Sequence, residues 1–283
     1  MSEQGPRTEA IDYVARWRDQ IRSREEQGRR LDRLHDRDDP WAGARAKRFR
    51  QMARQSGSAD PLVELIRAEL TPTTTVLDVG AGAGRHVVPV APLVASVTAV
   101  EPSPAMRQQL DEVIREKGLT NVSVVAGGWP GAEVPSADVV ICSHVTYFVE
   151  DIDGFLLRLR EVTRRCGYLV HRHRQREQPY LELFQRIWGE PRLLEPTFAD
   201  LFGASAQVEF FANVTAIPYS ISITFDTLDE AVEVVRREIL NPEGPRTDWV
   251  IRDYLNEHMV QRDGKWGFNP VPTFAGVLWW EAG

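Results

Sequence analysis

Cysteine is scarce in this chain, and long apolar runs are absent from it. The 283 residues contain only Cys142 and Cys166, which form no pattern typical of a disulfide framework. Such cysteine usage is typical of a reducing compartment, so we expect a cytoplasmic protein. Residues 1–20 are polar, and no apolar run is long enough to cross a bilayer. We therefore predict neither a signal peptide nor a membrane partner.

Positive charge is also in short supply. The chain has 34 Lys and Arg against 41 Asp and Glu, a net charge of −7, which argues against nucleic acid as its main partner. Clusters of His and Cys with metal-ligand spacing are lacking, so we expect no metal site. Hydrophobic residues make up 42% of the chain, which is ordinary for a globular protein. The length suits one large domain or a core with an appended cap.

The stretch from Thr75 to Pro104 carries the clearest pattern. An apolar run at Val76–Val79 predicts a buried strand, and a second run at Val97–Val100 predicts another that ends on Glu101. Between them we expect a helix from about residue 85 to residue 93. Three glycines follow the first strand at alternate positions, where bare main chain lets a ligand approach: Gly80, Gly82 and Gly84. This is a Rossmann-type unit, and it predicts a nucleotide or nucleoside site with Glu101 bonded to ribose hydroxyls.

Asp78 selects among the candidate ligands. A nicotinamide or flavin dinucleotide presents its pyrophosphate to such a turn, and a carboxylate beside it would repel that charge. The dinucleotide fingerprint also requires a glycine where this chain has Arg85. S-adenosylmethionine carries an ammonium and a sulfonium instead, both cationic, which suit an acid at this position.

The same stretch resembles the first two motifs of class I S-adenosylmethionine-dependent methyltransferases. LDVGAGAG matches their D/E-x-G-x-G-x-G loop, VEPSPAM matches the acid and turn after their second strand, and the resemblance extends to about Val170. It implies S-adenosylmethionine as cofactor and S-adenosylhomocysteine as product. The implied cofactor contacts are Asp78, Gly80, Ala81, Gly82, Gly84, Glu101, Pro102, Met106, Gly127, Gly128, Trp129 and Ser143. An acid that the family commonly uses for adenine is missing at AGGWP, so backbone at Gly127 and Gly128 and stacking by Trp129 would replace it.

Further strands are expected at residues 122–125, 137–142 and 168–171, with helices at 104–117 and 152–164 between them. These repeated units predict a parallel sheet whose carboxyl edge binds ligands. Ser143, His144 and Tyr147 follow one strand at that edge, and His171 and His173 end the next. We take His144, His171 and His173 as candidate catalytic bases and Tyr147 as a candidate substrate contact.

The region before the core, residues 1–58, predicts a helical extension or cap. Ile11, Val14, Trp17 and Ile21 recur at helical spacing, so the extension could pack one stripe on the core, act as a lid or serve as the arm of a homodimer. The family resemblance adds Trp41 and Arg45 as contacts to the methionine end of the cofactor.

The predicted fold is α/β, a Rossmann-like doubly wound sheet of seven strands. Residues 59–175 form the cofactor-binding core, and residues 176–283 contribute insertion helices and strands six and seven. Strand six is expected within residues 206–217, and strand seven, near residues 271–283, is expected to run antiparallel between strands five and six. The long segment between them predicts a helical lid over the substrate that carries the aromatic residues Phe225, Trp249, Tyr254 and Trp266.

The predicted activity is methyl transfer to a small organic acceptor through O, N, S or C. Two alternatives remain open from the sequence. One is another S-adenosylmethionine-dependent reaction, such as propylamine or carboxyl transfer. The other is a non-catalytic cofactor-binding partner of an active enzyme.

Overall fold

The computed structural model describes residues 11–31, 60–174, 178–240, 242, 244 and 246–282. The predicted cofactor contacts Trp41 and Arg45 lie outside the described residues, as do the predicted domain boundaries at residues 58 and 175. None of the helices in the described ranges is long and apolar enough to span a membrane.

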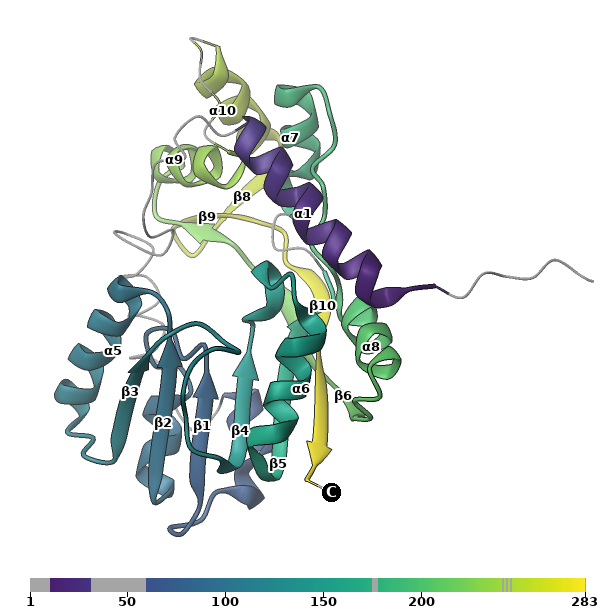
Figure 1. The fold of residues 1–283 in the computed structure, drawn as a ribbon. Helices are drawn as coiled ribbons and strands as arrows, with labels where there is room; N and C mark the ends of the chain where they lie inside the picture. Colours follow the sequence, from purple (N-terminus) through teal and green to yellow (C-terminus); the bar gives the residue numbers. More distant parts are fainter. Residues whose placement is uncertain are drawn as a thin grey trace, which may run out of the picture.

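A seven-stranded sheet forms the centre of the molecule, in the order β3-β2-β1-β4-β5-β10-β6. β1 to β5 are parallel to their neighbours among themselves, and β10 runs antiparallel between β5 and β6 (Figure 1). The strands are β1 Thr75–Val79, β2 Ser96–Glu101, β3 Val122–Ala126, β4 Ala137–Ser143, β5 Thr163–Arg172, β6 Asn213–Ile221 and β10 Val271–Glu281. The predicted fold class, including the antiparallel seventh strand, is confirmed.

Helices cover both faces of this sheet because its strands alternate buried side chains between the faces. Along β1, Leu77 and Val79 belong to one hydrophobic cluster and Val76 belongs to another. The cluster with Leu77 is closed by α1 Tyr13–Leu31, α6 Ile152–Val162 and α8 Phe198–Gln207. The opposite cluster is closed by α3 Pro61–Leu65, α4 Val87–Val90 and α5 Pro104–Lys117. Short 3-10 helices lie at Arg67–Glu69 (η1), Ala91–Leu93 (η2), Thr146–Phe148 (η3) and Gln178–Tyr180 (η4).

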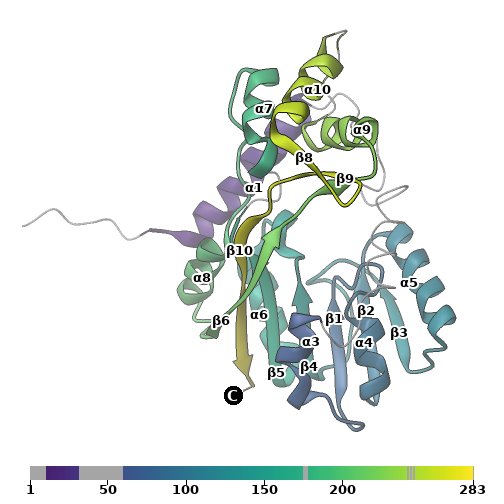
Figure 2. The ribbon, with the colours of Figure 1, turned by 180° about the vertical axis from the view of Figure 1, so that it is seen from behind.

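A cap lies over the carboxyl ends of the parallel strands, as both ribbon views show (Figures 1 and 2). It has its own hydrophobic core, which includes Tyr180, Phe184, Phe225, Tyr254 and Phe268. Its elements are α7 Leu181–Trp188, β7 Thr224–Phe225, α9 Leu228–Glu238, α10 Thr247–His258, β8 Met259–Arg262 and β9 Lys265–Phe268. The insertion between β6 and β10 is therefore not purely helical as predicted, since β7, β9 and β8 form a second sheet.

Several predicted boundaries differ from the observed ones. β6 continues to Ile221, because its whole length pairs with β10. β5 begins at Thr163 and α6 ends at Val162, since Thr163 already pairs with Ala137 of β4. The helix after the glycine turn begins at Val87, two residues later than expected.

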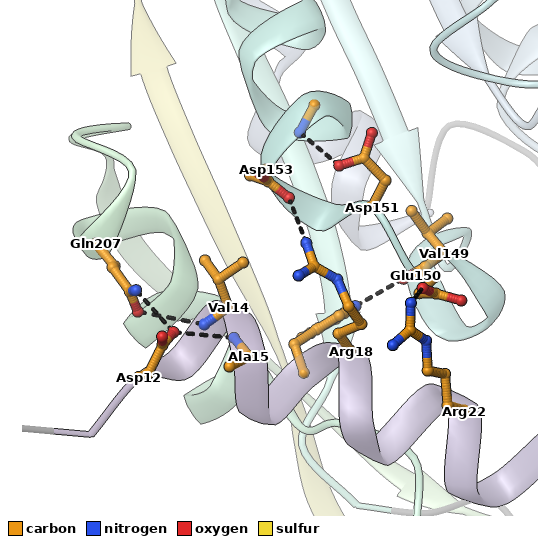
Figure 3. A network of polar contacts seen from close by, with 12 residues as sticks. Asp12, Val14, Ala15, Arg18, Arg22, Val149, Glu150, Asp151, Asp153 and Gln207 are labelled. Carbon is orange, nitrogen blue, oxygen red and sulfur yellow. Dashed lines mark hydrogen bonds and ion pairs between the residues drawn. The ribbon is translucent and has the colours of Figure 1, made fainter.

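The N-terminal helix α1 is fastened along its length to the core. At its start, the Gln207 side chain accepts the Tyr13 N–H at 2.7 Å. It also accepts the Val14 N–H at 3.2 Å and donates to Asp12 at 2.8 Å, as Figure 3 shows. In the middle of α1, the Trp17 indole N–H donates to the Val149 carbonyl at 2.7 Å, and Arg22 pairs with Glu150. These contacts fit the predicted packing of one stripe on the core. Whether α1 also contacts a second copy stays a prediction.

Candidate active site

The glycine turn after β1 is held against β2 by its own backbone. The N–H groups of Gly80 and Ala81 donate to the Val100 carbonyl at 2.8 and 3.0 Å. Gly80, Gly82 and Gly84 all have positive φ angles, of 74°, 57° and 95°. A Cβ at Gly80 would lie 2.3 Å from Val145, whereas a Cβ at Gly82 would meet no atom within 4 Å. Gly80 is thus needed for packing, and the Gly82 backbone borders open space that a ligand can use.

Glu101 at the tip of β2 is locked by two backbone hydrogen bonds. Its Oε2 accepts the Gly82 N–H and its Oε1 accepts the Ser103 N–H, both at 2.8 Å. A carboxylate has about four lone-pair positions, so further bonds to ribose hydroxyls remain feasible. The structure joins this acid to the glycine turn, and its role toward ribose stays a prediction.

Asp78 is the most unusual group of the site. Its side chain is 2% exposed, and its Oδ2 has no hydrogen-bond partner in the described part of the chain. Burial raises the pKa of this carboxyl to about 6, while His86 opposes and Glu101 adds to the rise. A buried carboxylate without a partner is costly, and a cationic ligand group would relieve the cost. Together with the open space at Gly82, this donor set fits the ammonium-bearing S-adenosyl group.

An ion-pair cluster beside the turn was missed by the sequence reasoning. Asp60 accepts the Arg85 guanidinium at 2.8 Å, lies 3.6 Å from His86 Nε2 and caps α3 through the Leu62 N–H. Burial alone would raise the pKa of Asp60, but His86 and Arg85 outweigh it and hold the pKa well below its usual range. The cluster fixes Arg85 and His86 at the end of the turn. Asp60-Pro61 signals a helix start in the sequence, yet nothing local indicates its pairing with Arg85.

The predicted adenine side is only partly arranged as expected. The Gly127 N–H approaches the Glu101 carbonyl at 3.5 Å, and a Cβ at Gly128 would meet no atom within 4 Å. The Trp129 indole N–H, however, donates to the Phe155 carbonyl at 3.2 Å on α6. Its ring therefore packs toward α6, and stacking on adenine stays a prediction.

The two other predicted contacts after β2 lie on opposite sides of its turn. Met106 is buried in the first turn of α5, where its N–H donates to the Ser103 hydroxyl at 3.1 Å. Pro102 is exposed, and its carbonyl accepts the Arg107 guanidinium at 2.7 Å.

Ser143, His144 and Tyr147 lie together after β4, as predicted. Ser143 is the last residue of β4, and the His144 N–H donates to the Val170 carbonyl at 3.0 Å. His144 has a φ of 60°, and its Nδ1 lies 2.7 Å from Tyr147 Oη. Tyr147 is 4% exposed, and the Arg172 guanidinium lies 3.7 Å from the centroid of its ring.

His144 is solvent-exposed. Desolvation by the neighbouring protein, with the positive charges of Arg172 and Arg85, lowers the pKa of His144 well below 6.5. His144 is therefore a neutral imidazole at neutral pH.

His171 does not fit the predicted role of a base. It is fully buried, its Nε2 donates to the Pro196 carbonyl at 2.9 Å, and its Nδ1 lies 2.8 Å from the Thr146 hydroxyl. Burial lowers the pKa of His171 to about 3. Both ring nitrogens have partners inside the protein, so neither is left to act as a base.

His173 lies beyond the end of β5 and stacks on Phe274 with ring centroids 4.5 Å apart. The structure gives it no contact with the other two histidines. Among the described residues, no three His, Cys, Asp or Glu side chains come together as a metal site would require.

The aromatic residues predicted to line the lid mostly build the core of the cap instead. Tyr254 is 3% exposed and donates to the Pro179 carbonyl at 2.9 Å, while Phe225 is buried and Trp266 packs against the same cluster. Trp249 is 67% exposed on α10. The expectation that Tyr254 contacts substrate is therefore not supported, because its ring and hydroxyl are already used inside the cap.

Comparison with known proteins gives the same assignment to the core. Residues 77–171 match a family model described as a methyltransferase domain. The uncharacterized methyltransferase YcgJ of Bacillus subtilis is 28% identical over 120 residues, which are 41% of this chain and 47% of YcgJ. The dimethyladenosine transferase of Saccharomyces cerevisiae is 28% identical over 185 residues, 65% of this chain and 54% of that protein. The chain thus spans about half the length of these curated relatives.

Solved structures share the fold at low sequence identity. The crystal structure of YcgJ superposes with a TM-score of 0.51 at 17% identity and covers 76% of this chain and 96% of YcgJ. Magnesium protoporphyrin IX methyltransferase of Synechocystis PCC 6803, with bound S-adenosylhomocysteine, superposes with a TM-score of 0.50 at 14% identity and covers 96% of this chain and 100% of that chain.

The sheet order and the glycine turn with its two acids define the class I S-adenosylmethionine-dependent methyltransferase fold. Residues 77–171 of this chain match a methyltransferase domain within that fold.

Proposed function

We propose that this protein transfers a methyl group from S-adenosylmethionine to a small organic acceptor and releases S-adenosylhomocysteine. The observation that carries the proposal is Asp78, a buried carboxylate whose Oδ2 lacks a partner among the described residues, directly before open main chain at Gly82. A ligand that brings positive charge to this place relieves the cost of the buried acid. A ligand that brings pyrophosphate increases that cost.

The small size of the acceptor is supported by charge and architecture. The net charge of −7 disfavours a polyanionic partner such as nucleic acid. The cap stands over the carboxyl ends of the parallel strands, which is where open α/β sheets bind ligands (Figure 1). Both features favour a compact acceptor enclosed between the cap and the sheet edge.

The residues of the chain would divide the work of the reaction. Bound S-adenosylmethionine supplies an electrophilic methyl group on a sulfonium. Asp78 and Glu101 would hold the cofactor, with the Gly82 main chain against it. His144 and Tyr147, after β4, are placed to contact the acceptor. Since sulfonium is a good leaving group, alignment of the acceptor and exclusion of water provide most of the rate enhancement.

Calorimetric titration tests the proposal. S-adenosylhomocysteine should bind the wild-type chain, and NAD should not. Asp78→Asn and Glu101→Gln should each weaken binding by about tenfold or more, because each removes a charge-assisted contact. Asp138→Asn is the matched control. Asp138 lies near the start of β4, at the end of the strand away from the candidate site, where it accepts the Thr75 N–H at 2.8 Å.

Acceptors are then screened by incubating the protein with S-adenosylmethionine and following methylated product by mass spectrometry. Binding of NAD, or no binding of S-adenosylhomocysteine, would overturn the cofactor assignment. Cofactor binding with no methylation across acceptors of every class would overturn the activity.

A further inference from the structure

The hydroxyl of Tyr147 has two hydrogen-bond partners in the described part of the chain. One is the backbone N–H of Arg172, at 3.1 Å from Oη. The other is Nδ1 of His144, at 2.7 Å. The Tyr147 ring is held in place by the His171 ring, with centroids 4.5 Å apart, and by the Arg172 guanidinium.

The available protons determine which group is the donor in the hydrogen bond between Tyr147 Oη and His144 Nδ1. The Arg172 N–H is a donor, so it can give a proton to Tyr147 Oη but cannot take one. Burial raises the pKa of Tyr147, so its phenol keeps its proton. That proton has one acceptor within the described ranges, Nδ1 of His144. A neutral imidazole that accepts at Nδ1 carries its own proton on Nε2.

The other side of the His144 ring has no hydrogen-bond partner among the residues that the structure describes. Within the described residues Nε2 makes no hydrogen bond, and His144 is exposed just beyond the end of β4. The hydrogen bond from the His144 N–H to the Val170 carbonyl fixes the backbone that carries the imidazole. The hydrogen bond to Tyr147 fixes the Nδ1 side of the ring. Nε2–H is thus a fixed donor at the edge of the sheet where ligands bind.

We propose that Tyr147 is a positioning residue that holds His144 as a hydrogen-bond donor at Nε2, and that the methyl acceptor carries a carboxylate bound by this N–H. The proposal rests on the proposed methyltransferase function and deepens it by naming the class of acceptor. His144 then recognises the acceptor and does not remove a proton from it. A carboxylate is ionised at neutral pH, so its oxygen can form the new O–CH3 bond without a base. The S–CH3 bond would break at the same time, S-adenosylhomocysteine would leave with the electron pair, and no proton would be released.

Desolvation, and then the positive charges of two guanidinium groups, those of Arg172 and Arg85, lower the pKa of His144. Each also pairs with an acid, Arg172 with Glu195 at 3.4 Å and Arg85 with Asp60 at 2.8 Å. These pairs hold the two cations in place, and an incoming carboxylate would share them.

The tautomer is measured directly by two-bond proton–nitrogen NMR on the chain labelled with 15N-histidine. The signals of His144 are identified by their loss in His144→Gln. The expected result is a protonated Nε2 and an unprotonated Nδ1 in wild type, and a mixture of both tautomers in Tyr147→Phe. Tyr168→Phe, a second buried tyrosine on β5, is the matched control and should leave the tautomer unchanged. A protonated Nδ1 in wild type, or no change in Tyr147→Phe, overturns the proposal.

Recognition of a carboxylate is tested with pairs of probes in the presence of S-adenosylhomocysteine. The probes are acetate, benzoate and decanoate, each beside its uncharged amide. At least one carboxylate should bind about tenfold or more tighter than its amide, the gain typical of a hydrogen bond to a charged group. His144→Gln should keep this preference because the glutamine amide can donate, and His144→Ala should lose it. Equal binding of every pair, or loss of the preference in His144→Gln, overturns the proposal.

The two levels of inference fail in different ways. If wild type does not bind S-adenosylhomocysteine, the proposed function fails. The tautomer of His144 can still be measured in that case, because the NMR experiment uses the chain without cofactor. If the cofactor binds but the tautomer or the probes disagree, only the carboxylate assignment fails.

Discussion

Replacement of Asp78 by asparagine should make the protein more stable and a poorer binder of its cofactor. The carboxyl of Asp78 is 2% exposed, and burial raises its pKa from 3.8 to about 6. Each unit of pKa corresponds to about 1.4 kcal/mol, so the ionised group destabilises the folded state by about 3 kcal/mol above pH 6. Asparagine has nearly the same shape and no charge, so it removes this cost.

The stability advantage of Asp78→Asn over wild type should increase as the pH rises. The folded state holds the Asp78 proton more tightly than the unfolded state, so this group lowers stability as the pH rises from about 4 to above 6. The difference in unfolding free energy between Asp78→Asn and wild type should therefore grow by about 2 kcal/mol between pH 4.5 and pH 8. Using the difference cancels the contribution of every other carboxyl group.

Urea unfolding of both proteins at the two pH values provides the measurement. Asp138→Asn is the control with the opposite sign, because the Asp138 carboxylate accepts two hydrogen bonds from Thr75 that lower its pKa. Asp138→Asn should be less stable than wild type at pH 8, and the deficit should shrink in acid. A stability difference for Asp78→Asn that does not change with pH would refute the electrostatic reasoning.

Three further outcomes follow from the same site. Affinity for S-adenosylhomocysteine should fall as the pH drops below about 6, since Asp78 then takes up a proton; calorimetry at pH 5 and pH 8 checks this, and a constant affinity would show that Asp78 is not the charged contact. Gly80→Ala should destabilise the fold more than Gly82→Ala, because the positive φ strains an alanine at both positions but only at Gly80 would the Cβ also lie 2.3 Å from Val145. Gly82→Ala should in addition reduce cofactor affinity; urea unfolding and calorimetry on both variants separate the two effects, and the reverse ranking in stability would contradict them. Trp17→Ala should cost about 3–5 kcal/mol, as the loss of a fully buried aromatic ring does, and a cost below about 1 kcal/mol in urea unfolding would mean that α1 is not part of the core.

The sequence predicted those parts of the fold that depend on residues close to one another in the chain. The helix after β2 begins and ends where predicted, since Ser103 accepts the Met106 N–H at its start and Gly118 takes a φ of 64° at its end. The glycine turn and the two acids Asp78 and Glu101 could also be predicted, because residue types and spacing alone constrain them. Their meeting through the bond from Gly82 to Glu101 follows from the parallel pairing of β1 with β2.

The parts that sequence did not predict depend on contacts between distant segments. Asp60 and Arg85 are 25 positions apart, and nothing in either neighbourhood marks them as partners. The strands β7, β8 and β9 of the cap have two to four residues each, too few for an alternating pattern to show. An aromatic side chain such as Tyr254 also reads the same in sequence whether it faces a substrate or, as here, its own core.

The place of β10 in the sheet bears on how the protein is made. β10 is the only element that joins β5 to β6 in the described sheet, yet it lies late in the chain (Figure 2). Roughly a hundred residues separate the end of β5 from the start of β10, which at about 5–20 residues per second amounts to roughly 5–20 s of synthesis. During that interval one edge of β5 has no partner strand, in a nascent chain whose β1 to β5 can already pair. The ribosome-bound intermediate therefore exposes a strand edge of the kind that recruits chaperones or aggregates, and this exposure ends only when the last strand inserts.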